Sequence, residues 1–264
     1  MAYERGFISR SLDEFLPQVQ LPPLPDNNLF LQPADEPWTL ILTGSTGSLG
    51  THILAVLARY PPERIRRVYC LNRSEPCPLK HRFALQDDRF VFLKAAFDTP
   101  MLGLQHALYH QLLDEVNLVI HNAWTVNFLL PGEAFRPSLA GLRNFLHFSY
   151  QSPLHPPVLF VSSLGIGYAA EVQHIEERVY NDADMASAIG DGYSQSIYVA
   201  KPVLSPLEKP EAWGCQTCWL HGTRRCVKWD TDPAKKANPS QHAKLVKSSP
   251  QRLGPLSTKG KELS

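Results

Sequence analysis

The stretch that decides the fold is WTLILTGSTGSLG, residues 38–50. It begins with a short apolar run, which is typical of a strand buried in a parallel sheet. Gly44, Gly47 and Gly50 follow at intervals of three residues. Apolar residues at helical spacing then continue through Ser48–Arg59. The stretch therefore predicts a strand, a glycine turn and a helix in direct succession.

Each of the three glycines has a physical reason in such a turn. Gly44 permits the tight turn after the strand, and Gly47 lets the backbone come close to a pyrophosphate. Gly50 lets the helix pack closely on the strand. Pyrophosphate charge suits the unpaired N–H groups at a helix start, although a turn without a ligand is the alternative. The candidate cofactor-binding residues here are Gly44, Ser45, Thr46, Gly47, Ser48, Leu49 and Gly50.

Apolar runs and helical patterns alternate beyond this stretch. Strands that alternate with helices predict a parallel sheet with helices on both faces, and right-handed crossovers make it doubly wound. The predicted class is α/β, a Rossmann-type doubly wound parallel sheet that is incomplete in its C-terminal part. Further strands are expected at 68–71, 90–93, 118–121 and 158–161, and further helices at 104–113, 134–150 and 192–201.

The pattern divides the chain into three parts. Residues 1–37 are polar and rich in proline, which predicts a leader or linker with at most a short helix within 10–16. Residues 38–201 form the expected nucleotide-binding domain. Residues 202–264 combine scattered Pro, Lys, Ser and Cys with little apolar periodicity, which predicts a mostly disordered basic tail.

The composition limits the possible binding partners and the cellular compartment of the protein. A net charge of +1 gives no general argument for nucleic acid or an anionic membrane as a partner. The start has no signal-peptide core, and no uncharged apolar stretch approaches the length needed to span a membrane. Five cysteines without a disulfide-like spacing favour a reducing compartment. We therefore expect a soluble, cytoplasmic protein.

The end of the second strand indicates which cofactor is preferred. NAD enzymes usually place an acidic residue there to hold the ribose hydroxyls. This chain has Asn72 and Arg73 instead, and an arginine favours a 2′-phosphate through forked, charge-assisted hydrogen bonds. The expected cofactor is NADP(H). A solvated surface arginine is the alternative, and the nearby Glu75 leaves NAD open.

Several motifs together resemble the thioester reductase domains of fungal nonribosomal-peptide-synthetase-like enzymes, carboxylic acid reductases and aminoadipate reductase. These domains belong to the extended short-chain dehydrogenases/reductases. The resemblance covers about residues 38–201, and the segment IHNAW followed by VNF is its most specific part. The matching segments are LTGSTGSLG at 42–50, VYCLNRS at 68–74, LGL at 102–104, VIHNAWTVNF at 119–128, GLRNFLHFS at 141–149, LFVSS at 159–163 and GYSQS at 192–196.

The resemblance implies roles for individual residues. His121, Asn122 and Ala123 would line the adenosine and ribose side of the cofactor, and Ser163 and Tyr193 would match the catalytic Ser/Thr and Tyr. The implied activity is NADPH-dependent reduction of a carrier-bound acyl thioester to an aldehyde or alcohol, in secondary-metabolite biosynthesis. A hydroxyl pair also suits this chemistry, because the forming oxyanion needs a proton donor. The alternatives are a strand-end cap for Ser163, packing for Tyr193 and a structural role for His121.

The chain departs from the family pattern at two positions. The family has a lysine four residues after the tyrosine, where this chain has Ile197. Lys201 is a poor replacement, because it lies about 12 Å along the helix axis from Tyr193. Ala96 stands where the family has an acidic residue before LGL.

The end of the chain departs further. Residues 203–264 resemble no continuation of the family, which suggests a truncated or frame-shifted product. The second functional hypothesis is accordingly a cofactor-binding remnant without turnover, and a weaker third is a sugar-nucleotide epimerase or dehydratase. No metal site is expected, because the spacing of the cysteines and histidine at 215, 218, 221 and 226 is irregular.

Overall fold

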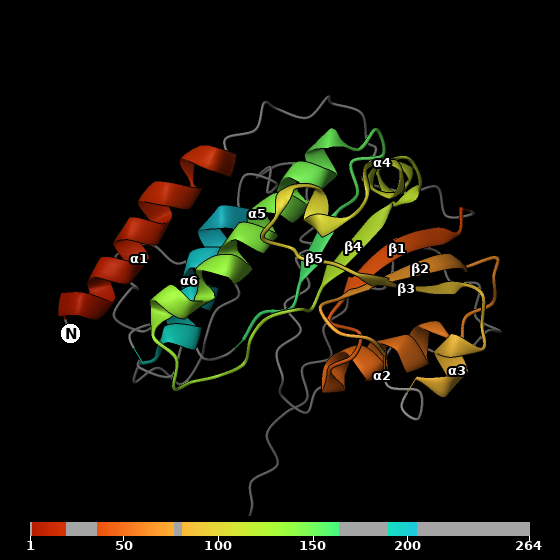
Figure 1. Ribbon diagram of the computed structural model, residues 1–264, viewed down its shortest axis with the longest axis horizontal. Coiled ribbons are helices and arrows are strands. Elements are labelled where there is room, and N and C mark those ends of the chain that lie inside the picture. Colours follow the sequence, from red (N-terminus) through yellow and green to blue (C-terminus); the bar gives the residue numbers. More distant parts are fainter. Residues whose placement is uncertain (1, 20–35, 77–80, 164–189, 205–264) are drawn as a thin grey trace, which may run out of the picture. The chain divides into compact units, whose positions relative to one another are not determined.

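A computed structural model describes residues 2–19, 36–76, 81–163 and 190–204 (Figure 1). The chain divides into two compact units, Met1–Gly222 and Thr223–Ser264. All the described residues belong to the first unit. The residues expected to form a basic tail beyond 204, including the cysteines and histidine weighed as a zinc site, lie outside the described residues.

The strands form one parallel sheet in the order β3-β2-β1-β4-β5. The chain steps outward from β1 to β3, then crosses back to the far side of β1 to form β4 and β5. The strand order therefore reverses between β1 and β4, and ligands of such sheets bind at this point, outside the carboxyl ends of the strands. The strands are β1 (Trp38–Thr43), β2 (Ile65–Asn72), β3 (Phe90–Lys94), β4 (Leu118–His121) and β5 (Val158–Phe160).

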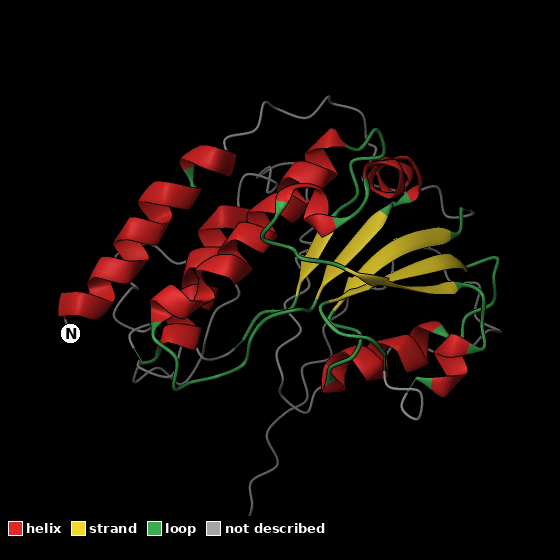
Figure 2. Cartoon of the chain, viewed as in Figure 1, coloured by secondary structure: helices red, strands yellow, loops and turns green. Residues whose placement is uncertain are grey.

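Helices cover both faces of this sheet (Figure 2). In β1, Leu40 and Leu42 pack with α2, whereas Ile41 between them packs with α4 and α5 on the opposite face. This alternation follows from the two-residue period of side chains in a strand. The α/β doubly wound fold class is thereby confirmed. The helices are α1 (Ala2–Phe15), η1 (Pro17–Val19), α2 (Ser48–Leu57), α3 (Arg82–Leu85), η2 (Pro100–Gly103), α4 (His106–Glu115), η3 (Gly132–Phe135), α5 (Arg136–Gln151) and α6 (Gly192–Leu204).

The α6 helix begins with a side-chain cap. The Ser194 backbone N–H donates to Asp191 Oδ1 at 2.8 Å, and the Ser194 hydroxyl donates to Asp191 Oδ2 at 2.8 Å. An aspartate in this position satisfies N–H groups that have no partner within the helix. Residues 192–201 were expected to be the start of a helix, and this helix continues through Pro202 to Leu204.

The N-terminal segment differs from the expected leader. Its helix α1 runs over 14 residues, and Phe7, Ile8 and Phe15 are buried in the core shared with α5 and α6. Arg10 Nη2 also pairs with Glu133 Oε1 at 2.6 Å. Apolar residues at 7, 8, 12 and 15 have helical spacing. That pattern was present in the sequence but was obscured by the polar residues between them.

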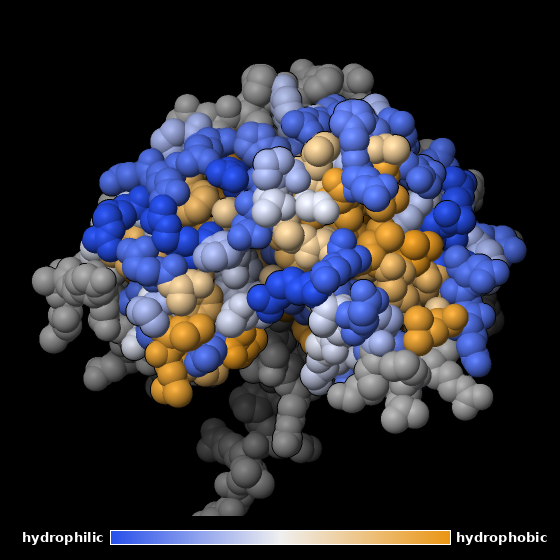
Figure 3. Space-filling model, viewed as in Figure 1, coloured by the Kyte–Doolittle hydropathy of each residue, from blue (hydrophilic) through white to orange (hydrophobic). Residues whose placement is uncertain are grey.

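The loop between β4 and η3 exposes apolar side chains. Val126, Phe128 and Leu129 are 66%, 52% and 94% exposed. At the lower left of Figure 3, apolar side chains gather where this loop turns in Figure 1. Large exposed apolar side chains close together usually mark a contact surface. We call Val126, Phe128 and Leu129 the apolar loop.

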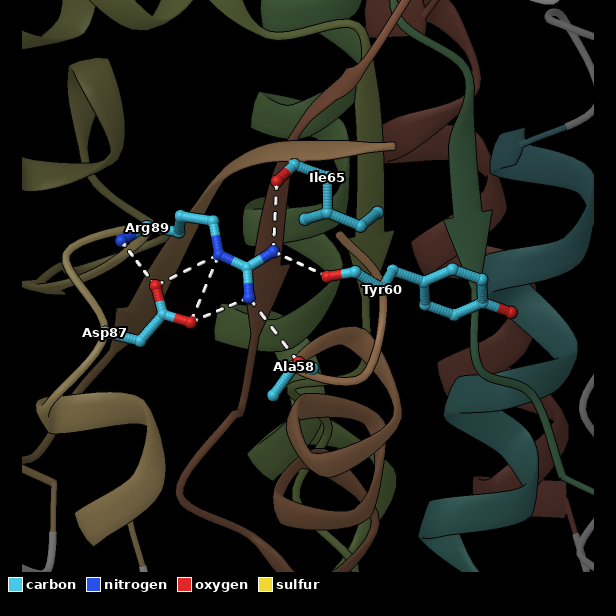
Figure 4. Close-up of polar contacts among 5 residues, drawn as sticks. All are labelled: Ala58, Tyr60, Ile65, Asp87 and Arg89. Atoms are coloured by element: carbon cyan, nitrogen blue, oxygen red, sulfur yellow. Dashed lines mark hydrogen bonds and ion pairs between the residues drawn. The ribbon is translucent and has the colours of Figure 1, made fainter. Parts of the chain in front are cut away.

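Arg89 connects the C-terminal end of α2 to the sheet (Figure 4). This is the end of the helix opposite the glycine turn. Its guanidinium donates to the Tyr60 carbonyl at 2.7 Å, to the Ala58 carbonyl at 3.5 Å and to the Ile65 carbonyl at 3.3 Å. It also pairs with Asp87 at 2.7 Å, and this hydrogen-bonded cation holds the pKa of Asp87 below its ordinary value. Carbonyls near a helix end attract such a cation.

Within the described ranges, none of the helices has the length and apolar character that crossing a membrane requires.

Candidate active site

The glycine turn lies at the carboxyl end of β1, beside the carboxyl end of β4. Gly44 has φ +67°, a left-handed conformation that residues with a Cβ rarely adopt. A Cβ at Gly44 would also lie 3.0 Å from Ala123 Cα and 3.2 Å from the Asn122 carbonyl carbon. Glycine is therefore required here both by the backbone conformation and by the closeness of the chain after β4.

Gly47 and Gly50 differ in what surrounds them. A Cβ at Gly50 would lie 2.1 Å from the Gly44 carbonyl oxygen, so this glycine sets the close packing of α2 on the turn. A Cβ at Gly47 would meet only that same oxygen, at 3.4 Å. Gly47 is the exposed N-cap of α2, and Ser48 and Leu49 after it are exposed too. The start of α2 thus presents its backbone to solvent, which suits an anion.

Ser45 and Asn72 lie behind the turn. Both side chains are buried, and the Asn72 amide donates to Ser45 Oγ at 2.7 Å and to the Cys70 carbonyl at 3.1 Å. The half-buried Thr46 donates its backbone N–H to Asn72 Oδ1 at 3.4 Å. These two candidates therefore hold the shape of the turn from inside. Arg73 is the residue directly after β2, and its side chain is exposed.

His81 also supports the turn, and the sequence analysis missed it. Its fully buried Nε2 lies 3.2 Å from the Ser45 carbonyl oxygen and 3.3 Å from Thr51 Oγ1. Thr51 in turn donates to the Gly47 carbonyl at 2.8 Å. No periodicity or motif marks His81, because it reaches the turn from a loop 36 residues away.

A network of hydrogen bonds joins the turn to the residues after β4. Thr43 Oγ1 accepts the backbone N–H groups of Asn122 at 3.0 Å and of Ala123 at 2.9 Å. The Asn122 side-chain amide donates to the Gly44 carbonyl at 3.2 Å. Asn122 and Ala123, expected to line the cofactor, thus lie against Gly44, and both are partly exposed.

His121 lies beneath this network and is buried. Its Nδ1 is 3.1 Å from Thr43 Oγ1, and its ring lies among the rings of Phe97, Phe145, Phe160 and Trp124. Burial lowers the pKa of His121 to about 3, so the imidazole is neutral at physiological pH. A neutral ring buried among aromatic rings supports the structural interpretation of His121 over one as an acid or base.

Trp124 connects the end of β4 with α6, the helix that carries Tyr193. Its indole Nε1 donates to Ser196 Oγ at 3.0 Å, and its ring contacts Phe160 of β5 at 5.1 Å. Tyr193 is 7% exposed and packs edge-on against Phe128 of the apolar loop at 5.0 Å. The partly buried Ser163 lies just beyond the carboxyl end of β5. Both candidate catalytic residues are thus on the side of the sheet where the glycine turn lies, and their catalytic roles stay a prediction.

The position of the family lysine is part of the core. Ile197 is fully buried within the main hydrophobic cluster, one helical turn after Tyr193. Lys201 is also buried, at 1% exposure. The departure noted in the sequence therefore has a structural counterpart: an apolar side chain packs where a ribose-binding cation would stand.

Among the described residues, other reactive groups give no second candidate. The thiol of Cys70 is buried in β2, and burial raises its pKa to about 12. In the part of the chain that the structure describes, no three His, Cys, Asp or Glu side chains are grouped so as to hold a metal ion.

Comparison with known proteins identifies what the chain is similar to. Residues 42–245 match an NAD-binding family described as male sterility protein. This match passes residue 201, so the expectation that the resemblance ends there was too narrow. The chain is 35% identical over 178 residues to a carboxylic acid reductase of Neurospora crassa, covering 64% of this chain and 16% of that protein.

Further similarities are to reductases of the same kind. The chain is 33% identical over 183 residues to the adenylate-forming reductase Nps9 of Serpula lacrymans, covering 63% of this chain and 16% of that protein. It superimposes on the terminal R domain from the myxalamid PKS-NRPS biosynthetic pathway with a TM-score of 0.55 and 25% identity, over 73% of this chain and 51% of that one. These similarities confirm the resemblance that the motifs indicated.

Proposed function

The chain belongs to the NAD-binding family described as male sterility protein, and on this premise we propose that it binds NADPH for the reduction of a carrier-bound acyl thioester. The observation that carries the proposal is the open backbone at Gly47, in a turn where Gly44 lies against the chain after β4 and Gly50 lies against the Gly44 carbonyl, both too closely for a Cβ. The backbone N–H groups that this leaves exposed at the start of α2 can bind a pyrophosphate.

The residues around the turn fit the rest of the cofactor. Asn122 and Ala123 lie beside Gly44, where the adenosine and ribose would pass. Arg73 is exposed after β2, and its guanidinium can bind a 2′-phosphate through two parallel hydrogen bonds. We propose that residues 38–201 form this cofactor-binding domain. The preference for NADPH over NADH rests on Arg73.

The proposed chemistry needs a hydride and a proton. NADPH, when bound, would supply a hydride for the thioester carbonyl carbon, and one proton per hydride is needed for the products to be an aldehyde and a free thiol. We assign the proton to the Tyr193 hydroxyl, with Ser163 as the second hydroxyl at the carbonyl oxygen. A tyrosine hydroxyl can act as such a donor when it is positioned at the developing oxyanion.

The apolar loop supports an acyl substrate. Phe128 packs against Tyr193 on one side and is 52% exposed on the other, and Leu129 is 94% exposed. The hydrocarbon part of an acyl thioester gains free energy when it covers such a surface. The apolar loop therefore offers a wall for the acyl chain next to the proposed proton donor.

A second candidate function is cofactor binding without turnover. The observation that favours it is Ile197, whose buried aliphatic side chain can neither bind a ribose nor bring positive charge near Tyr193. The chain spans only 16% of the length of the two reductases above, so the activity of a whole protein stays a proposal. Both functions share the cofactor site and differ in whether hydride transfer follows binding.

The experiment that separates them has two stages. NADPH is titrated first by its fluorescence, and then NADPH oxidation is followed with an acyl-pantetheine thioester. We expect saturable binding, and turnover sensitive to Tyr193→Phe supports the reductase. Saturable binding without turnover selects the second candidate. The absence of binding contradicts both.

A further inference from the structure

We propose that His121 is a positioning residue for the cofactor site, acting as the hydrogen-bond acceptor that directs the Thr43 hydroxyl. The proposal rests on the proposed function, because it concerns the turn that would bind NADPH. It assigns a task to a buried histidine that neither hydride transfer nor proton donation uses.

The Thr43 hydroxyl oxygen accepts two hydrogen bonds, which determines where its own hydrogen points. A hydroxyl has one hydrogen to donate and two lone pairs to accept with. The Asn122 and Ala123 backbone N–H groups both donate to Thr43 Oγ1, at 3.0 Å and 2.9 Å. Both lone pairs are therefore in use. The hydroxyl hydrogen must be donated, and His121 Nδ1 lies 3.1 Å away.

This arrangement fixes the protonation state of the ring. If His121 Nδ1 accepts a hydrogen bond, a neutral imidazole carries its own hydrogen on Nε2. The aromatic surroundings agree, because Phe145, Phe160, Phe97 and Trp124 offer no charge to stabilise an imidazolium. Among the described residues, His121 Nε2 has no hydrogen-bond partner. The only polar contact of the ring that these residues provide is thus the one with Thr43.

Burying an N–H group without a hydrogen-bond partner costs free energy. A histidine at this position therefore needs a compensating role. A phenylalanine at this position would suit the surrounding rings and would leave no polar atom unpaired. What a phenylalanine cannot do is accept the Thr43 hydrogen. Without that acceptor the hydroxyl rotates toward another oxygen. Its lone pairs then no longer face the Asn122 and Ala123 N–H groups, and these two hydrogen bonds are weakened. The segment after β4 would then lose its hold on the turn at Gly44.

Two substitutions of similar size test this proposal. His121→Asn retains an acceptor, because an asparagine Oδ1 lies close to where the histidine Nδ1 was. His121→Leu removes the acceptor but suits the apolar surroundings better. A merely structural role predicts that NADPH affinity follows stability, so the leucine variant binds at least as well as the asparagine variant. The positioning role predicts the opposite order.

The expected result is a separation of affinity from stability. Thermal unfolding should show the leucine variant to be at least as stable as the asparagine variant. NADPH should nevertheless bind the leucine variant about tenfold more weakly, which corresponds to one lost hydrogen bond in the site. Equal affinities, or tighter binding by the leucine variant, would overturn the proposal.

The partner residue gives a matched series. Thr43→Ser keeps the hydroxyl and should bind NADPH nearly as the unsubstituted chain does, whereas Thr43→Val should bind it about tenfold more weakly. Thr39→Val is the control, because Thr39 is equally buried at the opposite end of the same strand. Weaker binding in the Thr39 variant to the same degree would attribute the effect to general loss of strand stability.

Two further readouts do not depend on the cofactor. The ¹⁵N spectrum of His121 at pH 7 should show hydrogen on Nε2 and a bare Nδ1. Amide exchange at Asn122 and Ala123 should be slow in the unsubstituted chain and in the asparagine variant, and fast in the leucine variant. Failure to bind NADPH with these signatures intact would contradict the proposed function alone. Hydrogen on Nδ1, or equal exchange in both variants, would overturn the role of His121.

Discussion

Among single residues, Gly50 and Gly47 serve different needs of the turn. Gly50 is needed for close packing of α2, and Gly47 for an open backbone. Gly50→Ala forces a Cβ to within 2.1 Å of the Gly44 carbonyl oxygen, so we expect the chain to lose about 2 kcal/mol or more of stability. A Cβ at Gly47 has room, so the free energy of unfolding of Gly47→Ala should lie within about 1 kcal/mol of that of the unsubstituted chain. Denaturant unfolding of the two variants checks this. Equal losses would mean that the turn packs differently.

Arg73 carries the expectation for cofactor preference. Arg73→Ala should weaken NADPH binding about tenfold and leave NADH binding nearly unchanged, because only NADPH has a 2′-phosphate for the guanidinium to bind. Dissociation constants for both nucleotides provide the test, with Arg59→Ala as a control at another exposed arginine. An unchanged ratio of the two constants would remove Arg73 from the site.

Ile197 shows why restoring the family lysine is not a simple repair. The side chain is fully buried in the main core, so Ile197→Lys places an ammonium group in apolar surroundings. We expect a loss of about 3 kcal/mol or more, against about 1 kcal/mol for Ile197→Val. Thermal unfolding compares the two variants. A lysine variant as stable as the valine variant would show that the ammonium finds solvent or a partner near Tyr193.

At the scale of elements, Arg89 and Asp87 tie the end of α2 to the sheet. The pKa of Asp87 is lowered from its ordinary value of 3.8, chiefly by its hydrogen bonds with Arg89. The stability that this interaction contributes is therefore present above the unfolded pKa and is lost as the pH falls through the lower folded pKa. Asp87→Asn should accordingly cost about 1 kcal/mol at pH 7. The difference from the unsubstituted chain should narrow below about pH 4 in urea unfolding, and a pH-independent difference would contradict this account.

The strands and long helices could be predicted because local patterns specify them. Apolar runs indicated the positions of the five strands that the described residues form, and helical spacing indicated α2, α4, α5 and most of α6. The N-terminal helix was not expected at its full length, since polar residues lie between Ile8 and Phe15 and its stability comes from packing against α5 and α6. Helix propensity alone does not reveal such distant partners.

The candidate site could be predicted only in part, for the same reason. The glycines were identifiable from their spacing and the strand before them. The inward orientation of Ser45 and Asn72 was not, because the two side chains bond to each other across 27 residues of sequence. His81 and the acceptor role of His121 likewise depend on contacts between distant segments. Motifs therefore located the turn, whereas its supporting hydrogen bonds required the fold.

In the molecule as a whole, we propose that NADPH binds where the strand order of the sheet reverses. The direct measurement is a fluorescence titration of NADPH into the unsubstituted chain and into Gly47→Val, with circular dichroism to confirm that both are folded. We expect saturable binding by the unsubstituted chain and at least about a hundredfold weaker binding by the valine variant, because two methyl groups then occupy the approach of the pyrophosphate. Equal affinity of the two folded proteins, or no binding by the unsubstituted chain, would contradict this proposal.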